Sequence, residues 1–503
     1  MTLNPLQPSN PEEIARAAAP LAASRGLAAL LDLAQARKTE VFLVGGTVRD
    51  LLLERFSLDL DFAVSHDTLN LARELARILG GTFVLLDEGE RTARVVAGGE
   101  ILDLAEFRGP TLEADLRGRD FTINAMALDL RGLREGALPA LIDPLGGRPD
   151  LAAGRLRLVS EANLAADPLR LLRAYRFAAT LGFTITPETR EAIRRQTREF
   201  PRVAGERVRH ELFLLLGAPG GGALLPDMDE VGLLTRIFPE LEDLRDVPQD
   251  GFHHLEVFQH SLETVAQMEK VLARPGEFFR ELSGAVEDLA RKPGKAPVLK
   301  LAALFHDAGK PLVQERRSQP ERYTFYQHER VGVEIWEQAA ARLRLSQAET
   351  RGVSHLIAWH MRPFLLLPLF LRGDLSLRAL GRMVKAAKGE LAAGFTLAMA
   401  DSLAAQGPQK PPEAEVQLSR LADAAWRFHQ ERLLPQESQP RLLTGEDLKA
   451  LGLTPGPEFR RLLEAVAEAQ WEGQVASREE ALALVQRLVA GNKKNADKME
   501  KDN

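Results

Sequence analysis

The 503-residue sequence predicts an α+β protein in which a small mixed β-sheet comes first and helices make up the rest. The first observation is a series of short β-rich runs that alternate with helical stretches, at residues 41–44, 58–64, 82–86, 92–97 and 101–107. The second is that strand signals fade after Gly147, where apolar residues such as Leu169, Leu172 and Leu181 recur at a helical spacing.

The same patterns divide the chain into domains. Residues 1–27 form a polar lead with a short alanine-rich helix, and 28–147 form the sheet domain. A helical neck (148–250) and a histidine-rich helical body (251–406) follow. The Pro- and Gly-containing stretch 407–412 predicts a linker to a helical tail, 413–490. Residues 491–503 are charged and lack apolar anchors, which predicts disorder.

Composition excludes several classes of protein. Cysteine is absent, which rules out disulfides, a thiol nucleophile and cysteine zinc sites. No apolar run approaches the roughly 18 residues of a membrane span. The N-terminal residues lack the basic and apolar regions of a signal peptide, so we expect a cytoplasmic protein with no membrane partner.

The stretch from Val41 to Val64 carries the strongest chemical signal. A buried strand runs into Gly45-Gly46 and a helix, and a second strand then carries Asp59 and Asp61. Residues two apart on a strand face the same side, so the two carboxylates point to one place. The glycine turn at a helix N-terminus suits phosphate. Together they indicate metal-assisted phosphoryl or nucleotidyl transfer; the alternative is that Asp-x-Asp is the solvent face of a half-exposed strand.

These residues resemble the head domain of class II tRNA nucleotidyltransferases and bacterial poly(A) polymerases, members of the polymerase-β superfamily. The resemblance implies that Asp59 and Asp61 hold catalytic Mg²⁺ and that Gly45, Gly46 and Arg49 cradle phosphate. Asp103, in the run ILDLAEF, is the best-placed third catalytic carboxylate, unless it is a strand residue that faces solvent.

The segment RGRDFTINAMAL also matches the family. The resemblance implies that Arg119, Asp120 and Asn124 contact the ribose and phosphates of the nucleotide, although a charged pair beside an alternating apolar run can be structural. That run (Phe121, Ile123, Ala125) predicts a buried strand or the start of a helix.

A second strong match is ADPLRLLRAYRFAATLGF, residues 166–183. Asp167 and Arg170, placed three apart on one helix, would share a face. The resemblance implies that this pair reads the Watson–Crick edge of CTP or ATP without a nucleic-acid template; the alternative is a surface ion pair. Ala166 stands where the family has an acidic residue that orients the arginine. Arg173 and Arg176 are candidates for nucleotide or RNA phosphates, or residues of a solvated helix face.

The number of nucleotides added depends on one short connection. Family members that add the complete CCA carry a long flexible loop after the strand that ends in Phe-Arg. Here Phe107-Arg108 is followed by three residues, Gly109-Pro110-Thr111, before LEADL. We therefore expect addition of C only, from CTP, together with a separate A-adding enzyme. Complete CCA addition, A addition with ATP, and a poly(A) polymerase remain alternatives.

Histidines cluster in the body. The pattern of His260, His306-Asp307, His328, His360 and Asp401 resembles the HD phosphohydrolase superfamily. The resemblance implies a site for a divalent metal such as Mn²⁺, Ni²⁺, Fe²⁺ or Mg²⁺, with a second, hydrolytic activity as a hypothesis. The alternatives are buried core histidines, or a metal-dependent phosphohydrolase whose head is only an RNA-binding module. The tail is expected to hold the far end of the tRNA.

Overall fold

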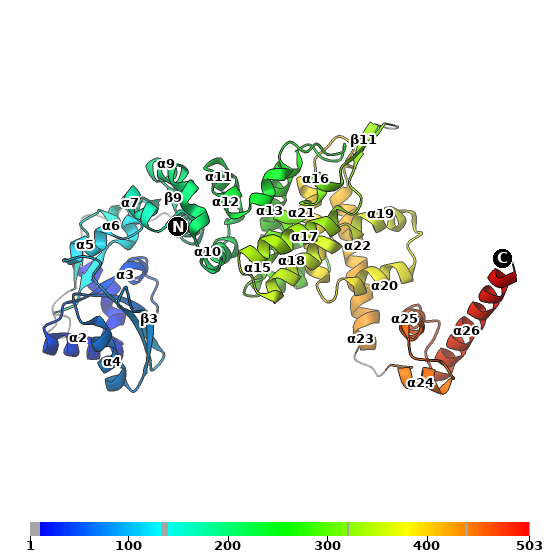
Figure 1. Ribbon diagram of the computed structural model, residues 1–503, viewed down its shortest axis with the longest axis horizontal. Coiled ribbons are helices and arrows are strands. Elements are labelled where there is room, and N and C mark those ends of the chain that lie inside the picture. Colours follow the sequence, from blue (N-terminus) through cyan, green and yellow to red (C-terminus); the bar gives the residue numbers. More distant parts are fainter. Residues whose placement is uncertain (1–10, 132–138, 319–320, 438–440, 502–503) are drawn as a thin grey trace. The chain divides into compact units, whose positions relative to one another are not determined.

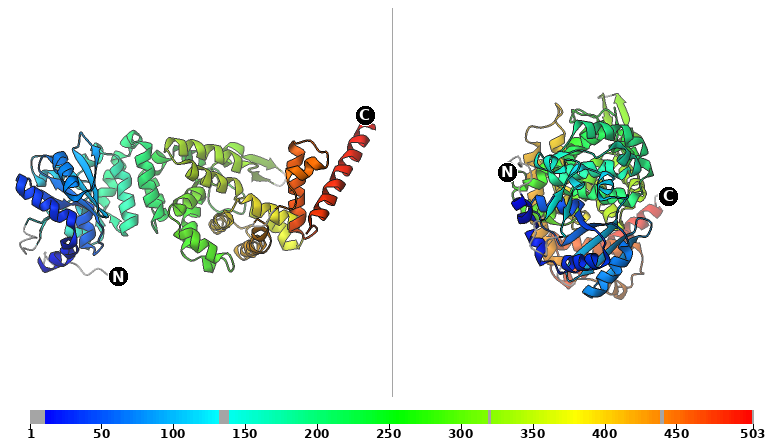
Figure 2. Two further views of the ribbon diagram at one scale, coloured as in Figure 1. Left: turned by 90° about the horizontal axis from the view of Figure 1, so that it is seen from below. Right: turned by 90° about the vertical axis from the view of Figure 1, so that its left-hand side faces the viewer.

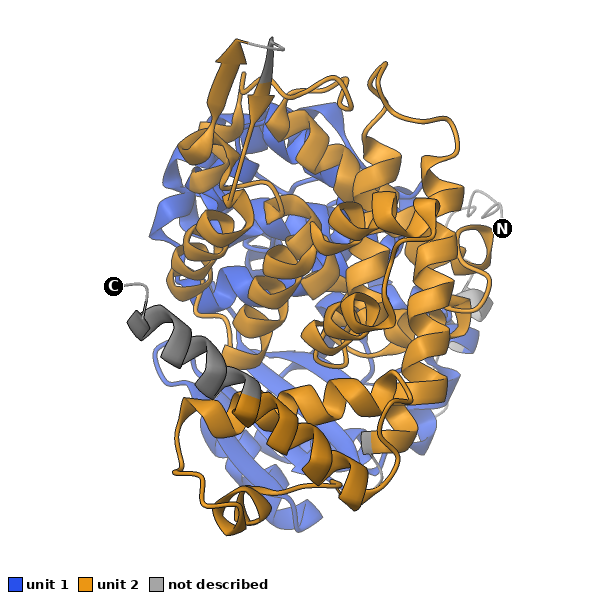
Figure 3. Ribbon diagram, turned by 90° about the vertical axis from the view of Figure 1, so that its right-hand side faces the viewer, with its two compact units in different colours: residues 1–239 blue, residues 240–503 orange. Residues whose placement is uncertain are grey.

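The computed structural model describes residues 11–131, 139–318, 321–437 and 441–501 (Figure 1). The chain forms two compact units, residues 1–239 and 240–503 (Figure 3). The first unit contains the sheet domain and the predicted neck as far as Pro239. The second contains the body and the tail.

A seven-stranded mixed sheet forms the core of the first unit, in the order β3-β4-β5-β2-β1-β6-β7. Only β2 and β5 pair in parallel; the other neighbours are antiparallel. The strands are β1 (Val41–Val44), β2 (Asp59–Val64), β3 (Thr82–Asp87), β4 (Thr92–Ala97), β5 (Glu100–Glu106), β6 (Ala127–Asp129) and β7 (Ala140–Ile142). The small mixed sheet predicted from the sequence is confirmed.

The last two strands were not predicted. The alternating run Phe121, Ile123, Ala125 forms a 3₁₀ turn at Thr122–Asn124, and strand β6 begins two residues later. Phe121 and Ile123 are fully buried, so their alternation reflects packing of a tight turn rather than a strand.

One face of the sheet is covered by helices α2 (Arg25–Arg37) and α4 (Thr68–Leu79). Helix α4 packs on β3, β4 and β5, and α2 packs on α4 (Figure 2). Leu60, Phe62, Leu102 and Leu104 are buried in β2 and β5. Because side chains alternate along a strand, the intervening residues are presented on the opposite face. That face carries the aspartates.

Short helices complete the first unit. The lead contains α1 (Pro11–Ala18), and the sheet domain contains α3 (Gly45–Leu52) and α5 (Leu112–Arg117). The neck contains α6 (Gly147–Ala152), α7 (Glu161–Ala166), α8 (Leu169–Leu181), α9 (Pro187–Gln196), α10 (Gly205–Gly217), α11 (Leu225–Glu230) and α12 (Leu234–Ile237). A two-stranded parallel sheet, β8 (Arg155–Leu156) with β9 (Thr184–Ile185), also lies in the neck.

Among its described residues, the second unit has one antiparallel strand pair, β10 (Glu315–Ser318) with β11 (Glu321–Thr324), and its other regular elements are helices. Its helices up to the predicted linker are α13 (Val257–Ala273), α14 (Ser283–Arg291), α15 (Lys295–Phe305), α16 (Lys310–Val313), α17 (His328–Arg342), α18 (Gln347–Trp359), α19 (Arg362–Arg372), α20 (Leu377–Ala386) and α21 (Leu391–Ala404). Helix α21 is almost entirely buried and packs against α13, α14 and α15. It is the central helix of the body.

The structure contradicts the predicted boundary at residues 407–412. Helix α22 (Ala414–Phe428) belongs to the body, because its Leu418, Leu421 and Phe428 lie in one apolar cluster with residues of α21. The backbone of the supposed linker is fixed as well: Gly407 N donates to Phe252 O at 2.8 Å. A Pro- and Gly-rich composition here marks a turn within the body.

The tail has its own apolar cluster, which spans Leu443 to Val485. It comprises α24 (Gly445–Ala450), α25 (Pro457–Trp471) and α26 (Arg478–Lys501), after the short α23 (Leu434–Glu437). The prediction of disorder for residues 491–503 disagrees with the assignment of helix as far as Lys501; positions 502 and 503 lie outside the described residues. The reason is that Lys, Ala, Glu and Met are good helix formers even without apolar anchors.

Within the described residues, no single helix is long and apolar enough to cross a membrane. One helix pair, Arg16–Ala23 with Arg25–Arg37, meets the criterion by length and composition only, and it is bent by 89°.

Candidate active site and metal cluster

Three aspartates meet on the open face of the sheet. The parallel register of β2 and β5 places Asp61 directly beside Asp103. Asp59 lies two residues before Asp61 and therefore points to the same face. The structure thus brings together the three carboxylates that the sequence nominated, although Asp61 and Asp103 are 42 residues apart in the chain.

The electrostatics of Asp61 favour a bound cation. Burial, followed by the neighbouring Asp103 carboxylate, raises the pKa of Asp61, and Arg119, Thr47 and Arg49 lower it only in part. Thr47 Oγ1 accepts a hydrogen bond from Asp61 N at 2.9 Å and fixes the strand at this point. A hard divalent cation would relieve the repulsion, and carboxylate oxygens are the ligands that Mg²⁺ prefers. The residues therefore fit the implied metal.

Asp103 already has a partner in the structure. Arg94, from the adjacent strand β4, donates from Nε and Nη2 to the two carboxylate oxygens at 2.8 Å each. Sequence reasoning missed Arg94, because its role depends on the antiparallel register that sets it opposite Asp103. The Arg94 guanidinium holds Asp103 on the side of β4, whereas Asp61 accepts a hydrogen bond from Thr47 Oγ1 at 3.3 Å.

The two glycines open the helix N-terminus toward the carboxylates. Gly45 has a φ of +69°, and a Cβ there would lie 2.8 Å from Arg119 Nη1. A Cβ on Gly46 would come within 3.7 Å of Asp61 Oδ2. Side chains at either position would fill the space between α3 and β2. Gly45 N itself donates to Met126 O at 3.3 Å, so the predicted phosphate cradle would use the N–H groups that follow Gly45 in the first turn of α3.

A chain of polar contacts connects this cradle to the neck. Arg49 Nη1 donates to Asn124 Oδ1 at 2.7 Å, and Asn124 Nδ2 donates to Asp120 Oδ1 at 3.0 Å. Arg173 closes the chain through Nε and Nη2 on Asp120 Oδ2 at 2.9 and 2.7 Å. Burial alone would raise the pKa of Asp120, but Arg173 and Asn124 outweigh it and lower the pKa to about 2. This carboxylate is therefore ionised and orients the residues around it.

Three of the nominated arginines gather around one aromatic ring. The guanidinium carbons of Arg49, Arg173 and Arg176 lie 5.1, 5.2 and 3.6 Å from the centre of the Phe177 ring. Glu211 on α10 accepts from Arg173 Nη1 at 3.3 Å and from Arg176 Nε at 2.8 Å. The Phe177 ring thus packs against three cations, two of which also share the Glu211 carboxylate.

The pair nominated for base recognition is arranged differently from the prediction. Asp167 does not share a helix with Arg170: it ends α7 in an extended conformation, with φ −137° and ψ 94°. The reason is Pro168, since the residue before a proline is disfavoured in the helical region. Asp167 Oδ2 accepts from Arg207 Nη2 at 2.9 Å, while Arg170 Nη1 donates to the carbonyl oxygen of Gly118 at 3.0 Å.

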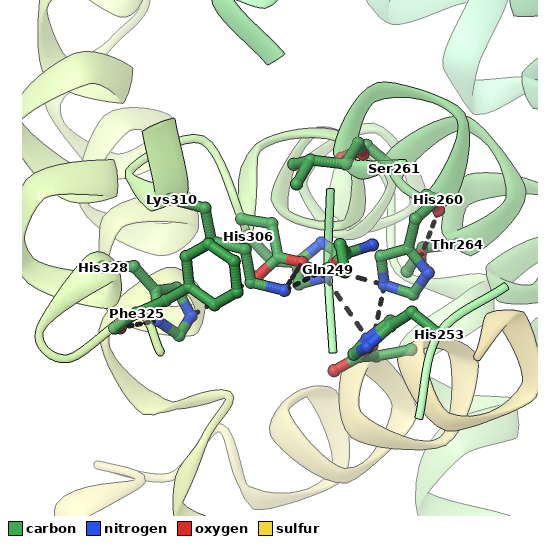
Figure 4. Close-up of polar contacts among 12 residues, drawn as sticks. Gln249, His253, His260, Ser261, Thr264, His306, Lys310, Phe325 and His328 are labelled. Atoms are coloured by element: carbon green, nitrogen blue, oxygen red, sulfur yellow. Dashed lines mark hydrogen bonds and ion pairs between the residues drawn. The ribbon is translucent and has the colours of Figure 1, made fainter. Parts of the chain in front are cut away.

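The second unit contains the predicted metal cluster. Three groups of side chains have ligand atoms close enough to share an ion: His253, His260 and Asp401; His260, His306 and Asp307; and Asp307, His328 and His360. Figure 4 shows His253, His260, His306 and His328 around this centre. All six residues nominated from the sequence meet here, and His253 is an addition that sequence reasoning missed.

The ring nitrogens of the cluster are oriented for metal. Nδ1 of His306, His328 and His360 lies 2.8, 2.7 and 2.7 Å, respectively, from the carbonyl oxygen three residues earlier. A carbonyl only accepts, so Nδ1 carries a proton and Nε2 is the ring nitrogen left to face a cation. Backbone contacts of this kind commonly orient metal-ligating histidines.

The carboxylates complete the ligand set. His306 Nε2 lies 3.2 Å from Asp307 Oδ2 and 3.7 Å from Asp401 Oδ1 without a hydrogen bond to either. His328 Nε2 lies 3.3 Å from Asp307 Oδ1. Burial by itself would lower the pKa of His306, but Asp307 and Asp401 raise it to about 10. The cluster therefore attracts positive charge, and a divalent cation fits it.

Two other histidines of the cluster have lowered pKa values, in contrast to His306. Burial lowers the pKa of His260 to about 4, against the opposing effect of Asp401. Burial, followed by the neighbouring His328 and His306, lowers the pKa of His360 to about 3. Neutral imidazole is the form that ligates metal. Both residues are therefore in the ligating state over the ordinary pH range.

Sequence reasoning missed several residues because their roles exist only in the folded chain. They are the partners of the nominated residues: Thr47, Arg94, Asp115, Asn163, Glu211, His253 and Lys310. Asp115 accepts from Arg119 Nη2 at 2.9 Å, and Lys310 Nζ lies 2.6 Å from Asp307 Oδ2. Only His253 had a signal in the sequence, as one more histidine in the histidine-rich segment.

Three parts of the chain match models of known families. Residues 41–157 match the "Poly A polymerase head domain", 182–244 match the "Probable RNA and SrmB- binding site of polymerase A", and 257–424 match the "HD domain". A solved structure of the Thermotoga maritima CCA-adding enzyme complexed with tRNA shares the fold. Its TM-score is 0.62 at 22% identity, over 92% of this chain and 95% of that one.

Two curated relatives cover nearly the whole chain. The A-adding tRNA nucleotidyltransferase of Deinococcus radiodurans is 39% identical over 456 residues, which is 88% of this chain and 94% of the relative. The CC-adding tRNA nucleotidyltransferase of Thermus thermophilus is 37% identical over 454 residues, 89% of this chain and 93% of the relative. With its glycine turn, carboxylates and arginine-rich neck in place, the chain belongs to the tRNA nucleotidyltransferase family and is a nucleotidyltransferase.

Proposed function

We propose that this enzyme adds C residues from CTP to the 3′ ends of tRNA, without a nucleic-acid template and with release of pyrophosphate. The relatives act on tRNA by name but divide between A and CC addition. The choice between these products therefore depends on residues of this chain.

We assign the following roles to the residues of the site. Asp59 and Asp61, with Asp103 beside them, would hold Mg²⁺, which supplies charge neutralisation at the reacting phosphate and lowers the pKa of the attacking hydroxyl. The open N-terminus of α3, together with Arg49 and Arg119, binds phosphate. Asp120, Asn124 and Arg173 orient the nucleotide, and Asp167 with Arg170 selects the base.

The observation that favours C addition is the connection between β5 and α5. Strand β5 ends at Glu106 and α5 begins at Leu112, with Thr111 as its N-cap. Arg108 N donates to Asp115 Oδ1 at 3.2 Å, and a Cβ on Gly109 would lie 2.8 Å from Ala114 Cβ. The connection is both short and packed onto α5. It therefore lacks the length and freedom of a lever that could rearrange the base-selecting residues between CTP and ATP.

The test is incorporation on three tRNA transcripts that end at the discriminator base, at C and at CC, with CTP or ATP supplied separately. We expect CTP to extend the first two transcripts and ATP to leave the third unchanged. ATP addition to the third transcript would show complete CCA or A addition and would overturn the proposal. Long ATP-dependent tails on unrelated RNAs would identify a poly(A) polymerase instead.

A second candidate function is supported by the cluster in the body. His306 Nε2 and His260 Nδ1 are buried and make no hydrogen bond, while two carboxylates converge on the same space. We propose that this site binds Mn²⁺, Ni²⁺ or Mg²⁺ and hydrolyses phosphoesters. Hydrolysis of 2′,3′-cyclic nucleotides by the metal-loaded enzyme tests it; metal binding without any hydrolysis would show a structural site.

A further inference from the structure

The base-selecting arginine is held in an unusual way. The residue before Asp167 is Ala166, which offers no acceptor for a guanidinium. Arg170 Nη1 instead donates to two backbone carbonyl oxygens, of Gly118 at 3.0 Å and of Asn163 at 3.2 Å. Burial lowers the pKa of Arg170, so this partly enclosed cation depends on these acceptors.

The side chain of Asn163 secures the same stretch of backbone. Its Nδ2 donates to Arg117 O at 2.8 Å and to Arg119 O at 2.7 Å. The carbonyls of three consecutive residues, 117, 118 and 119, are thus engaged by the neck: Asn163 holds the outer two and Arg170 holds the middle one. Asn163 therefore acts twice: its side-chain amide binds the 117 and 119 carbonyls, and its backbone carbonyl accepts from Arg170.

This arrangement fixes the direction in which the guanidinium points. Among the residues that the structure describes, Nε and Nη2 of Arg170 have no hydrogen-bond partner. A planar guanidinium anchored through one nitrogen presents its remaining donors in a fixed plane. Movement of the 117–119 backbone would tilt that plane. Selection of a base by hydrogen bonds is sensitive to such a tilt, because a misaligned donor loses most of its energy.

We propose that Asn163 is a positioning residue for base selection: it clamps the Arg117–Arg119 backbone and so orients Arg170, in the place of a side chain at position 166. The clamp also links the two parts of the nucleotide site, since Arg119 belongs to the residues beside Gly45. This inference depends on the proposed function, in which Arg170 reads the base.

The test is the ratio of kcat/KM for CTP to that for UTP on a tRNA transcript that ends at the discriminator base. Asn163→Ala removes both amide hydrogen bonds and frees the 117–119 backbone, so Arg170 loses its fixed orientation and the ratio is expected to fall about tenfold. Arg170→Ala should lower the ratio as well. The double variant should match Arg170→Ala alone, because Asn163 acts through Arg170.

Ser160→Ala is the matched control. Ser160 caps the same helix through a bond from Asn163 N at 3.3 Å, so this variant weakens α7 but keeps the amide clamp. It should retain the wild-type ratio. The unfolding midpoint of each variant is measured as well, to check that the variant is folded.

An unchanged ratio in Asn163→Ala, with a reduced ratio in Arg170→Ala, would overturn the inference and leave the proposed function intact. An equal loss of kcat/KM for both nucleotides would show a purely structural role and also overturn it. An unchanged ratio in Arg170→Ala would contradict the proposed base selection itself.

Discussion

Replacement of Asp61 by alanine is expected to reduce CTP incorporation at least about 10³-fold, since bound metal contributes several kcal/mol to the transition state. Asp61 is the carboxylate flanked by Asp103, Thr47 and the open turn at Gly46. In the proposed function, its loss removes one of the carboxylates that would hold the metal. Binding of tRNA should stay within about threefold of the wild type, because no phosphate-binding cation is removed. Single-turnover incorporation and a filter-binding titration measure the two effects.

Asp87→Asn provides the control for that loss. Asp87 is a carboxylate on the same sheet, at the end of edge strand β3, and its replacement should leave incorporation unchanged. Asp59→Ala should behave like Asp61→Ala. Substantial residual transfer by either alanine variant would refute the assignment of these two residues as metal ligands.

Replacement of Asp307 by asparagine is expected to abolish metal binding in the body without loss of CTP transfer. Asp307 lies within 4 Å of ring nitrogens of His306, His328 and His360, so it is shared by two of the three possible ligand groups. Asparagine keeps the shape and an acceptor for Lys310 but removes the charge. Metal content after loading with Mn²⁺ or Ni²⁺ and gel filtration, together with transfer activity, measures the outcome.

His355→Ala is the control for the metal measurement. His355 lies in the same unit, and its Nε2 is 3.0 Å from the Ala387 carbonyl oxygen, outside the cluster. It should retain the metal. Full metal content in Asp307→Asn would show that the ion binds elsewhere. Loss of CTP transfer in Asp307→Asn, with normal folding, would contradict the independence of the two sites.

Much of the molecule could be predicted because its signals are local. The glycine turn and the Asp-x-Asp strand each lie within a few residues. The histidine pattern extends from His260 to Asp401, and its members were found because the ordered set resembles a known family; the structure places them together. The five strands from β1 to β5 agree with their predicted bounds to within about one residue, because short apolar runs ended by turn residues define a strand well.

What could not be predicted depends on register and on sequence-distant contacts. Arg94 reaches Asp103 only because β4 and β5 align these residues. Arg207 reaches Asp167 across 40 residues of chain. Likewise, the clamp of Asn163 on residues 117 and 119 is invisible in a sequence. Asp167 was placed wrongly for a different reason. The prediction put it on the same helix as Arg170, although a residue before a proline, here Pro168, is disfavoured in the helical conformation.

The boundary near residue 410 failed for a related reason. Proline and glycine predict a local turn, but they do not predict whether the helix that follows packs on the same core. Helix α22 packs back on the apolar cluster that contains α21, and its buried Leu418 and Leu421 make this contact. The apolar face of α22 was visible in the sequence, but its partner was not.

Sequencing of tRNA 3′ ends after incubation with all four nucleoside triphosphates is the most direct measurement of the central claim. The substrate is a transcript that ends at the discriminator base, so every added nucleotide is read in order. We expect products that end in CC, with no A and no longer tail. Products that end in CCA, or A added without C, would contradict the claim that the short, packed connection before α5 limits this enzyme to C.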